Sequence, residues 1–303
     1  MPKCLVSGGG GFIGSHLVDK LIKEKCEVVV VDNFITGKKE NINKDYKIDI
    51  YVSDITDGDR LREIFYEEKP DYVFHLAALA RIQLSIDEPL ITFRTNVNGT
   101  LNMLECSKEF GVKRFIYSSS SSVYGNQENP LKEDMFPMPI SPYAMQKYNG
   151  EQYCQIYSKY YDLETICLRY FNVYGTRVDL DSAYKLVMAI WAEQKKNAKP
   201  LSIYGRGDQT RDFTHVRDVV EANYLSMISE TKFKADAFNI GSGEEIPIRE
   251  LAKYFNWKME FIKNPRPYEE KRKKADISKA KRILGWQPKV KISEGINELI
   301  KSI

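Results

Sequence analysis

The sequence predicts an α/β protein built on a doubly wound parallel sheet, with a smaller C-terminal α/β lobe. Three observations predict this class. Short apolar runs alternate with helical patterns through the first half of the chain. Four consecutive valines in Glu27–Asp32 indicate a strand that is buried on both faces, as in parallel sheets. A glycine-rich turn, Gly8–Gly14, joins the first strand to the first helix.

The elements follow in order along residues 1–170. Strands are expected over Cys4–Ser7, Glu27–Asp32, Lys47–Ser53, Tyr72–Leu76, Arg114–Ser118 and Glu164–Tyr170. Helices are expected over Phe12–Lys25, Asp57–Glu68 with Asp57 as N-cap, Pro89–Phe110 and Tyr143–Tyr160. Prolines, glycines and aromatics break this alternation from Gly175 onward. We therefore expect a first domain over 1–170, to which residues 210–227 return, and a second lobe over 171–303.

Composition excludes several classes of function. The 303 residues are 43% hydrophobic and 29% charged, with a net charge of +3, so nothing indicates a nucleic-acid partner. No apolar run approaches the roughly 20 residues that span a membrane, and Met1–Val6 lacks the features of a signal peptide. The five cysteines are scattered without a C-x-x-C pair, so no metal site is expected. We expect a cytoplasmic protein with reduced thiols.

The glycine-rich turn has the residues that a Rossmann-like dinucleotide site needs. Gly8 allows the tight turn, Gly11 lets backbone N–H groups approach a pyrophosphate, and Gly14 lets the helix pack close to the sheet. Asp32 ends the second strand, where an acid can bind both adenosine ribose hydroxyls and repel a 2′-phosphate. The sequence therefore favours NAD over NADP, although Asp32 as a simple turn acid is the alternative and Lys38 and Lys39 lie nearby.

Tyr143 and Lys147 are four residues apart, so both lie on one face of the helix predicted over Tyr143–Tyr160. A phenol is a poor base at neutral pH, and a neighbouring ammonium group favours its phenolate form. The alternative is an amphipathic helix that merely contains both residue types. The glycine turn and the serine-rich strand that precede the pair favour a catalytic function.

Taken together, these motifs resemble the extended short-chain dehydrogenase/reductases. Besides the glycine turn, the resemblance rests on motifs that stand in order at the family's spacing, which are Asp32–Gly37, Ser53–Ile55, His75–Ala78, Ser118–Gly125, Tyr143–Lys147 and Arg169–Gly175. It covers nearly the whole chain and is greatest to UDP-glucose 4-epimerases and related sugar-nucleotide epimerases.

The resemblance implies roles for particular residues. The catalytic residues would be Tyr143, Lys147 and Ser120. NAD would meet Gly8, Gly11, Phe12, Ile13, Gly14, Asp32, Asn33, Gly37, Asp54, Ile55, Leu76, Ala77, Ala78, Asn96, Ser118, Tyr143, Lys147 and Tyr170. The nucleotide sugar, a UDP-sugar by preference, would meet Ser120, Tyr143, Asn172, Gln209, Arg211, Arg266 and Glu269. Two arginines suit a diphosphate because each offers forked donors.

The implied reaction is epimerisation at C4 of a UDP-glucose or UDP-galactose type of substrate, N-acetylated or not, through a transient 4-keto sugar. Related dehydratases carry Asp-Glu where this chain has Ser121 and Ser122, which argues against dehydration. Another sugar-nucleotide oxidoreductase (a reductase, a decarboxylase or a dehydratase) and a non-catalytic NAD-sensing protein are the alternatives. A homodimer through the helices near 89–110 and 143–160 is also implied.

Two positions depart from the family pattern and leave the sugar open. Lys273 stands near the position that gates sugar size, and Thr176–Leu186 replaces the usual Asn-Leu segment. The run from Lys271 to Lys274 is interpreted as a solvated face.

Overall fold

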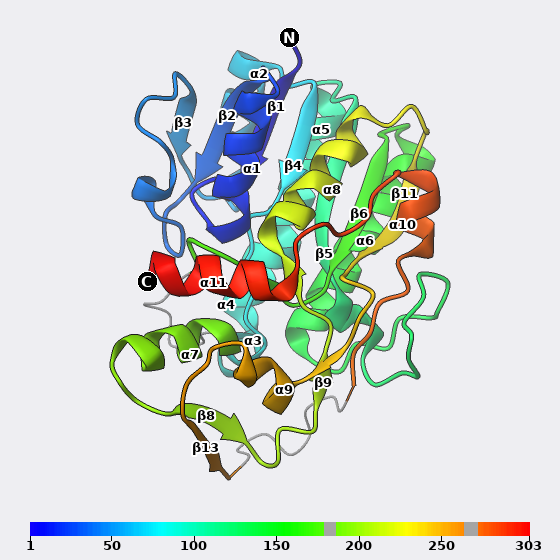
Figure 1. The fold of residues 1–303 in the computed structure, drawn as a ribbon. Helices are drawn as coiled ribbons and strands as arrows, with labels where there is room; N and C mark the ends of the chain where they lie inside the picture. The colour runs from blue at the N-terminus through cyan, green and yellow to red at the C-terminus, as the bar shows by residue number, and fades with distance from the viewer. Residues whose placement is uncertain (179–185, 264–271) are drawn as a thin grey trace.

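The computed structural model describes residues 1–178, 186–263 and 272–303. Its centre is a seven-stranded sheet in which every neighbouring pair of strands is parallel, in the order β11-β6-β5-β4-β1-β2-β3 (Figure 1). The strands are β1 (Lys3–Ser7), β2 (Glu27–Asp32), β3 (Asp49–Val52), β4 (Tyr72–His75), β5 (Arg114–Ser120), β6 (Thr165–Tyr170) and β11 (Lys234–Ile240). The predicted fold class is confirmed.

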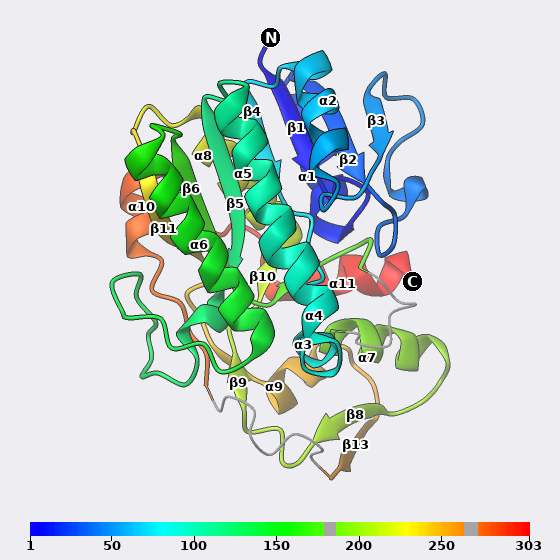
Figure 2. The same cartoon turned by 180° about the vertical axis from the view of Figure 1, so that it is seen from behind.

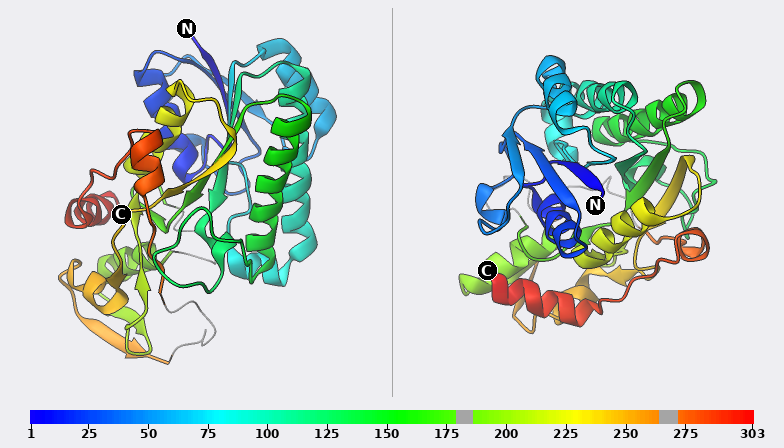
Figure 3. Two further views of the ribbon diagram at one scale, coloured as in Figure 1. Left: turned by 90° about the vertical axis from the view of Figure 1, so that its right-hand side faces the viewer. Right: turned by 90° about the horizontal axis from the view of Figure 1, so that it is seen from above.

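Helices cover both faces of this sheet. Helices α1 (Phe12–Lys23) and α8 (Val216–Ile228) lie on one face, and α2 (Gly58–Glu68), α5 (Gly99–Glu109) and α6 (Pro142–Tyr160) lie on the other (Figures 1 and 2). The left view of Figure 3 shows the sheet edge-on between these two layers. Val28 and Val30 pack in the core under α1 and α8, whereas Val29 and Val31 pack under α2 and α5. The valine run is therefore buried on both faces, as predicted.

Most element positions are confirmed, and the differences have local causes. Asp57 caps α2, since its Oδ1 accepts a hydrogen bond from the Arg60 N–H at 3.0 Å. The helix predicted over Pro89–Phe110 is confirmed, but a π-helical turn interrupts its regular hydrogen bonding. The helix is divided into α4 (Pro89–Phe93), a π-helical turn η2 (Arg94–Asn98) and α5. Such turns bring one side chain out of the helical register and often mark functional positions.

The second lobe has its own core and lies below the sheet in Figure 1. Its elements are α7 (Val187–Lys196), β8 (Leu201–Tyr204), β9 (Thr210–Arg211), β12 (Ile246–Pro247), α9 (Ile248–Lys253), β13 (Met259–Ile262) and α11 (Ile292–Ser302). Trp191, Leu251, Phe255 and Leu299 fill this core. The remaining short elements are η1 (Lys39–Asn41), α3 (Ile82–Asp87), η3 (Ser121–Tyr124), β7 (Val173–Tyr174), β10 (Thr214–His215) and α10 (Ser278–Ile283).

Two segments from beyond residue 170 join the sheet. Helix α8, within the predicted returning segment 210–227, packs against α1. Strand β11 pairs with β6 over Lys234–Ile240, and the sequence analysis did not predict this strand. The division of the chain at residue 170 stays a prediction. In the described ranges, no helix is both long and apolar enough to cross a membrane.

Candidate active site

The predicted site residues gather at the carboxyl ends of the parallel strands. Gly8, Asp32, Leu76, Ser120 and Asn172 stand at or just beyond the ends of β1, β2, β4, β5 and β6. The strand order reverses between β1 and β4, because the chain builds outward from β1 to β3 and then crosses back. Ligands of doubly wound sheets bind in the crevice outside such a reversal. The topology therefore places these residues around one crevice.

The glycine turn is packed so tightly that side chains cannot replace its hydrogens. A Cβ on Gly14 would lie 2.0 Å from the Gly8 carbonyl oxygen, and one on Gly8 would lie 2.8 Å from the Ala77 nitrogen. Gly8 also has a φ of 75°, which L side chains rarely adopt. Helix α1 begins directly after Gly11, and no side chain caps its first N–H groups. Those donors and the helix dipole form a cradle for a phosphate group.

Asp32 lies next to the glycine turn that forms this phosphate cradle. Its carboxylate accepts hydrogen bonds from the Gly10 N–H at 2.8 Å and from the Phe34 N–H at 2.7 Å. Burial raises the pKa of Asp32, and the two backbone hydrogen bonds oppose that rise. Gly37 lies against the same carboxylate, since a Cβ there would stand 2.9 Å from Asp32 Oδ2. A carboxylate has about four acceptor positions, so two stay available for ribose hydroxyls.

Further predicted cofactor residues lie at the same end of the sheet. The Asn33 side chain donates to Asp54 Oδ2 at 2.7 Å, and Ile55 is buried against Gly99. Phe12 and Ile13 form the first turn of α1, and Leu76, Ala77 and Ala78 follow β4 next to Gly8. The glycine cradle and the acid at the end of β2 fit NAD, because both match its pyrophosphate and ribose groups.

Asn96 lies in the π-helical turn η2, and its side chain forms hydrogen bonds with Leu79 and Gln146. Its Oδ1 accepts from the Leu79 N–H at 2.8 Å, and its Nδ2 donates to Gln146 Oε1 at 2.8 Å. Gln146 donates in turn to Thr92 Oγ1 at 3.0 Å. Asn96 therefore holds the loop after β4 against α6, next to the predicted cofactor crevice.

Tyr143 and Ser120 meet where α6 begins and β5 ends. Helix α6 starts at Pro142 behind the N-cap Ser141, and the Tyr143 N–H donates to Ser85 Oγ at 3.0 Å. Burial raises the pKa of Tyr143, whereas its hydrogen bond with the Ser120 side chain and the charge of Arg81 lower it. Ser120 also accepts from Ser122 Oγ at 2.9 Å. The structure thus brings the predicted base and the predicted hydroxyl relay together.

Lys147 lies one helical turn further along α6 and is almost fully buried. Its Nζ donates to the Ser118 carbonyl at 2.8 Å. Burial lowers the pKa of Lys147 to about 8, and the nearby carboxylate of Glu151 opposes that fall. Lys147 follows Tyr143 by four residues on α6, and in general an ammonium group near a phenol favours the phenolate form.

Ser118 and Tyr170 also lie together, near the carboxyl ends of β5 and β6. Their hydroxyl oxygens are 3.0 Å apart, and the Asn223 Nδ2 on α8 donates to Tyr170 Oη at 2.8 Å. Burial raises the pKa of Tyr170 to about 12, so this phenol is neutral at physiological pH. Helix α8 therefore supports the site from the returning part of the chain.

The substrate side is only partly described. Asn172, with a φ of 28°, donates to the Asp212 carbonyl at 2.7 Å, and Gln209 and Arg211 stand at or next to β9. Arg211 is buried, and one of its Nη groups donates to the Thr210 carbonyl at 2.8 Å. The remaining two predicted residues, Arg266 and Glu269, lie outside the described residues.

The interpretation of residues 271–274 as a solvated face is wrong for Lys273. Arg272 is exposed and pairs with Glu245, but only 6% of Lys273 is exposed. The chain turns inward at this point, because the Ala275 N–H donates to the buried Asp212 carboxylate at 3.0 Å. Lysine in a charge run is usually solvated, so sequence alone gave no signal of this turn.

Sequence reasoning missed three buried charged residues near the site. Asp212 accepts hydrogen bonds from Ser242, Gly243 and Ala275 and so ties three loops together. Glu151 and Arg169 form a buried ion pair behind Lys147, with Arg169 Nη2 and Glu151 Oε2 2.7 Å apart. The spacing of Lys147 and Glu151 on one helix was the only available signal, and that spacing is common on helix surfaces.

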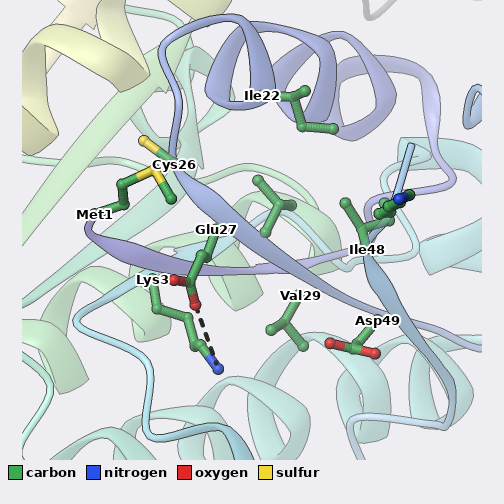
Figure 4. Close-up of a pocket in the computed structure, with 10 residues that line it drawn as sticks. Met1, Lys3, Ile22, Cys26, Glu27, Val29, Ile48 and Asp49 are labelled. Atoms are coloured by element: carbon green, nitrogen blue, oxygen red, sulfur yellow. Dashed lines mark ion pairs between the residues drawn. The ribbon is translucent and has the colours of Figure 1, made fainter. Parts of the chain in front are cut away.

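A pocket of about 350 Å³ lies at the opposite end of the sheet. Met1, Lys3, Cys26, Glu27 and Asp49 are among its lining residues (Figure 4). They stand at the amino ends of β1, β2 and β3, away from the glycine turn and from Tyr143. No group of three or more His, Cys, Asp or Glu side chains within the described ranges could hold a metal ion.

Comparisons with known proteins agree with this geometry. The family described as "NAD dependent epimerase/dehydratase family" matches residues 4–241. The UDP-glucose 4-epimerase of Thermotoga maritima, solved with UDP-glucose, is 39% identical over 99% of this chain and 98% of its own, with a TM-score of 0.94. The UDP-N-acetylglucosamine 4-epimerase of Methanobrevibacter ruminantium, solved with UDP-N-acetylmuramic acid, is 36% identical over 99% and 97%, with a TM-score of 0.93. A UDP-glucuronate 4-epimerase of Thermodesulfobacterium geofontis is 35% identical over 99% of this chain and 98% of its own.

Proposed function

We propose that this chain, which belongs to the NAD dependent epimerase/dehydratase family, epimerises a nucleotide sugar at C4. The observation that carries the proposal is the meeting of Tyr143, Ser120 and Lys147 at the carboxyl edge of the sheet, beside a glycine cradle that fits NAD. Relatives named as 4-epimerases of UDP-sugars match nearly the whole chain, which supports the same reaction here.

Tyr143 acts as the base that removes the proton of the sugar 4-hydroxyl. Ser120 hydrogen-bonds that hydroxyl and keeps its oxygen in line with Tyr143. Lys147 keeps a positive charge behind the phenol and favours the phenolate. When bound, NAD supplies a hydride acceptor and donor, so a 4-keto sugar forms and is reduced again with no net redox change. The proton returns from Tyr143 to the same oxygen once the sugar has presented its other face.

The nucleotide sugar would lie between the crevice and the second lobe. Asn172 and Arg211 would bind its diphosphate, Gln209 would line the nucleotide, and Arg266 and Glu269 would complete the site. UDP-glucose and UDP-galactose are the first candidates, and their N-acetyl forms are the next. The relatives named above act on sugars that differ in the substituents at C2 and C6, so the family leaves the sugar open.

The test is a turnover assay with the purified enzyme and NAD. We expect interconversion of UDP-glucose and UDP-galactose, or of their N-acetyl forms, measured by chromatography of the nucleotide sugars. Unchanged substrates in all four reactions would refute 4-epimerisation of this substrate class. Screening UDP-, GDP-, CDP- and dTDP-sugars by thermal shift identifies the base, because a ligand that binds the folded state raises Tm.

A different sugar-nucleotide oxidoreductase is the second candidate function. A reductase or a decarboxylase shares the fold and the Tyr–Lys pair, and NADH that accumulates during turnover would favour it. Dehydration is disfavoured because Ser121 and Ser122, both buried after β5, offer no carboxyl group to remove water. A purely NAD-sensing protein has no need of the assembled Tyr143–Ser120 pair.

We further propose that the enzyme is a homodimer joined through α4 and α6. Large apolar side chains are exposed on this helical layer, namely Ile82, Ile86, Leu90, Ile91, Phe93, Met145, Ile156 and Tyr160. The helices stand side by side in Figure 2 and contact each other. Exposed apolar patches of this kind often mark protein interfaces. Light scattering should give twice the chain mass, and Leu90→Glu should give the monomer.

A cytoplasmic location is the remaining part of the proposal. All five cysteines are free thiols, and four of them are buried. Reduced, buried cysteines are usual in reducing compartments. Fractionation of the source cells with an antibody against the chain would test this location.

A further inference from the structure

Glu151 lies beneath the Tyr143–Lys147 pair on the same helix. It stands one turn after Lys147 and two turns after Tyr143, and only 6% of it is exposed. Ser119 Oγ donates to its Oε1 at 2.5 Å. Arg169 donates to both of its carboxylate oxygens, with Nε to Oε1 at 2.9 Å and Nη2 to Oε2 at 2.7 Å. The carboxylate is therefore held in one orientation by three donors.

This arrangement joins the elements that carry the reacting groups. Ser119 lies on β5 between Ser118, whose carbonyl binds Lys147, and Ser120, which binds Tyr143. Arg169 lies on β6, and its guanidinium stands 4.7 Å from the ring centroid of Tyr124 in η3. Through Glu151, helix α6 is thus fixed against β5, β6 and η3.

A buried ion pair is weak evidence for stability, since apolar residues of similar volume often serve the fold as well or better. The location of the Glu151–Arg169 pair near Lys147 therefore indicates a role other than stability. Glu151 acts electrostatically on Lys147, whose ammonium group is buried in the same layer. The carboxylate opposes the effect of that burial.

The other titratable groups around Lys147 are neutral at physiological pH. On β4, burial lowers the pKa of His75 to about 3. On β5 and β6, burial raises the pKa of Tyr117 well above its usual value and that of Tyr170 to about 12, and the neighbouring Cys154 and burial raise that of Cys167. Glu151 and Arg169 thus carry the buried charges behind Lys147 in the described part of the chain, and Arg81 acts on Tyr143 from the start of α3.

We propose that Glu151 is a positioning residue of the reaction, which keeps Lys147 protonated beside Tyr143 and is itself held by Ser119 and Arg169. The inference rests on the proposed function, because it assigns Glu151 a role through the Tyr143–Lys147 pair. It extends the set of residues that act in the reaction from Tyr143, Ser120 and Lys147 to a buried row of alternating charges, Lys147, Glu151 and Arg169.

The first test is the pH profile of kcat in Glu151→Gln, which keeps the shape of the side chain and removes its charge. Residues one turn apart are separated by about 6 Å, so at an effective dielectric of about 20 the pKa of Lys147 should fall by about one to two units. The alkaline limb should move to lower pH by this amount. A shift of about one unit lowers kcat at pH 8 about fivefold. The pKa of Tyr143, which lies two turns from Glu151, should fall in the same variant by less.

Arg169→Met is the matched variant, in which we expect the pKa of Lys147 to shift in the opposite direction. It leaves the Glu151 carboxylate and removes the positive charge behind it, so the alkaline limb should move to higher pH. The double variant Glu151→Gln with Arg169→Met removes both charges and should return the limb close to its wild-type position. Opposite shifts in the single variants cannot come from general loosening of the fold. If Glu151→Gln does not fold, the Arg169→Met shift and the double variant still test the proposal.

A second readout is independent of turnover. The absorbance of the Tyr143 phenolate is obtained by subtracting a pH titration of the NAD-bound Tyr143→Phe variant from that of the NAD-bound protein. The midpoint of this Tyr143 titration should fall to lower pH in Glu151→Gln. Midpoints equal to wild type in both single variants, with kcat lowered evenly at all pH values, would overturn the proposal. If the wild type converts no nucleotide sugar while the Tyr143 midpoint still shifts, the proposed function fails and the role of Glu151 stands.

Discussion

The cofactor side and the substrate side of the site are held in place by different means. On the cofactor side, the backbone itself leaves no room for change, since a Cβ on Gly14 would overlap the Gly8 carbonyl and Asp32 is bound by two backbone N–H groups. On the substrate side, Arg211 stands on a strand of two residues. One half of the site is fixed by local backbone geometry, and the other by contacts between distant loops.

This difference suggests how such an enzyme can keep its chemistry and change its substrate. Side chains on short, loop-borne strands can be exchanged without moving the sheet, whereas the glycine turn cannot. Mutations on the substrate side of the site should therefore leave the cofactor side intact, and mutations on the cofactor side should leave the substrate side intact.

The largest expected effect is on the reaction itself. Tyr143→Phe removes the proposed base, so kcat should fall by about 10²- to 10⁴-fold, as for other general acid–base residues. Tm should stay close to wild type, because the phenyl ring keeps the packing. Turnover assays and a melting curve on the same preparation measure both. Full activity in this variant would remove Tyr143 from its role.

Gly14→Ala should act on the cofactor half. The new methyl group would lie 2.0 Å from the Gly8 carbonyl oxygen, a backbone atom that cannot move as a flexible side chain can. We expect a loss of about 3 kcal/mol in unfolding free energy and the loss of the Tm increase caused by NAD. Gly111→Ala is the control. Its φ is 68° and no atom lies within 4 Å of the new methyl group, so it should cost about 1 to 2 kcal/mol and leave NAD binding unchanged. Equal NAD responses in both variants would contradict this account.

Acid should destabilise the fold through two buried histidines, His75 and His215. Burial lowers the pKa of His75 to about 3 and that of His215 to about 4, whereas an unfolded histidine titrates near about 6.5. The unfolded chain therefore binds protons that the folded chain excludes. The stability from these groups is complete above about pH 6.5 and is lost as pH falls, at about 1.4 kcal/mol per pH unit for each histidine. Urea unfolding between pH 6.5 and 5 gives the slope of the unfolding free energy against pH. We expect this slope to be reduced by that amount in His75→Gln and in His215→Gln. An unchanged slope in either variant would show that its histidine does not titrate in this way.

The smallest effect is expected from Arg211→Lys on the substrate half. Lysine keeps the charge but loses the forked donors that suit a diphosphate, so KM for the nucleotide sugar should rise about tenfold. The affinity for NAD and the melting curve should not change. A loss of NAD binding in this variant would show that the two halves are coupled.

The local geometry of the cofactor half could be predicted from the sequence, because its requirements lie within short segments of the chain. Gly8, Gly11 and Gly14 stand within one turn, and the strand and helix that flank them are read from the same residues. The Tyr143–Lys147 spacing lies within one helix, and the structure places Ser120 beside it. The roles of these residues stay predictions, but their assembly in one place is now observed.

The rest depends on contacts that sequence spacing does not encode. Asp212 binds residues 30 and more positions away, and Glu151 meets Arg169 from the neighbouring strand. The burial of Lys273 follows from the inward turn at Ala275, which no local pattern marks. The π-helical turn at Arg94–Asn98 also interrupts a helix whose sequence reads as continuous.

Strand β11 lies far after its partner β6 in the sequence, and this order has a consequence for synthesis on the ribosome. Strand β6 is complete at Tyr170, but its outer partner is made only when residues 234–240 emerge. Until then β6 is an open edge, and the sheet face that α8 later covers exposes residues such as Ile116 and Ile166. Unpaired edges and exposed apolar faces attract other chains. A nascent chain that stalls within the second lobe should therefore depend on chaperones, and truncation near residue 170 should yield an aggregating fragment rather than a separate domain.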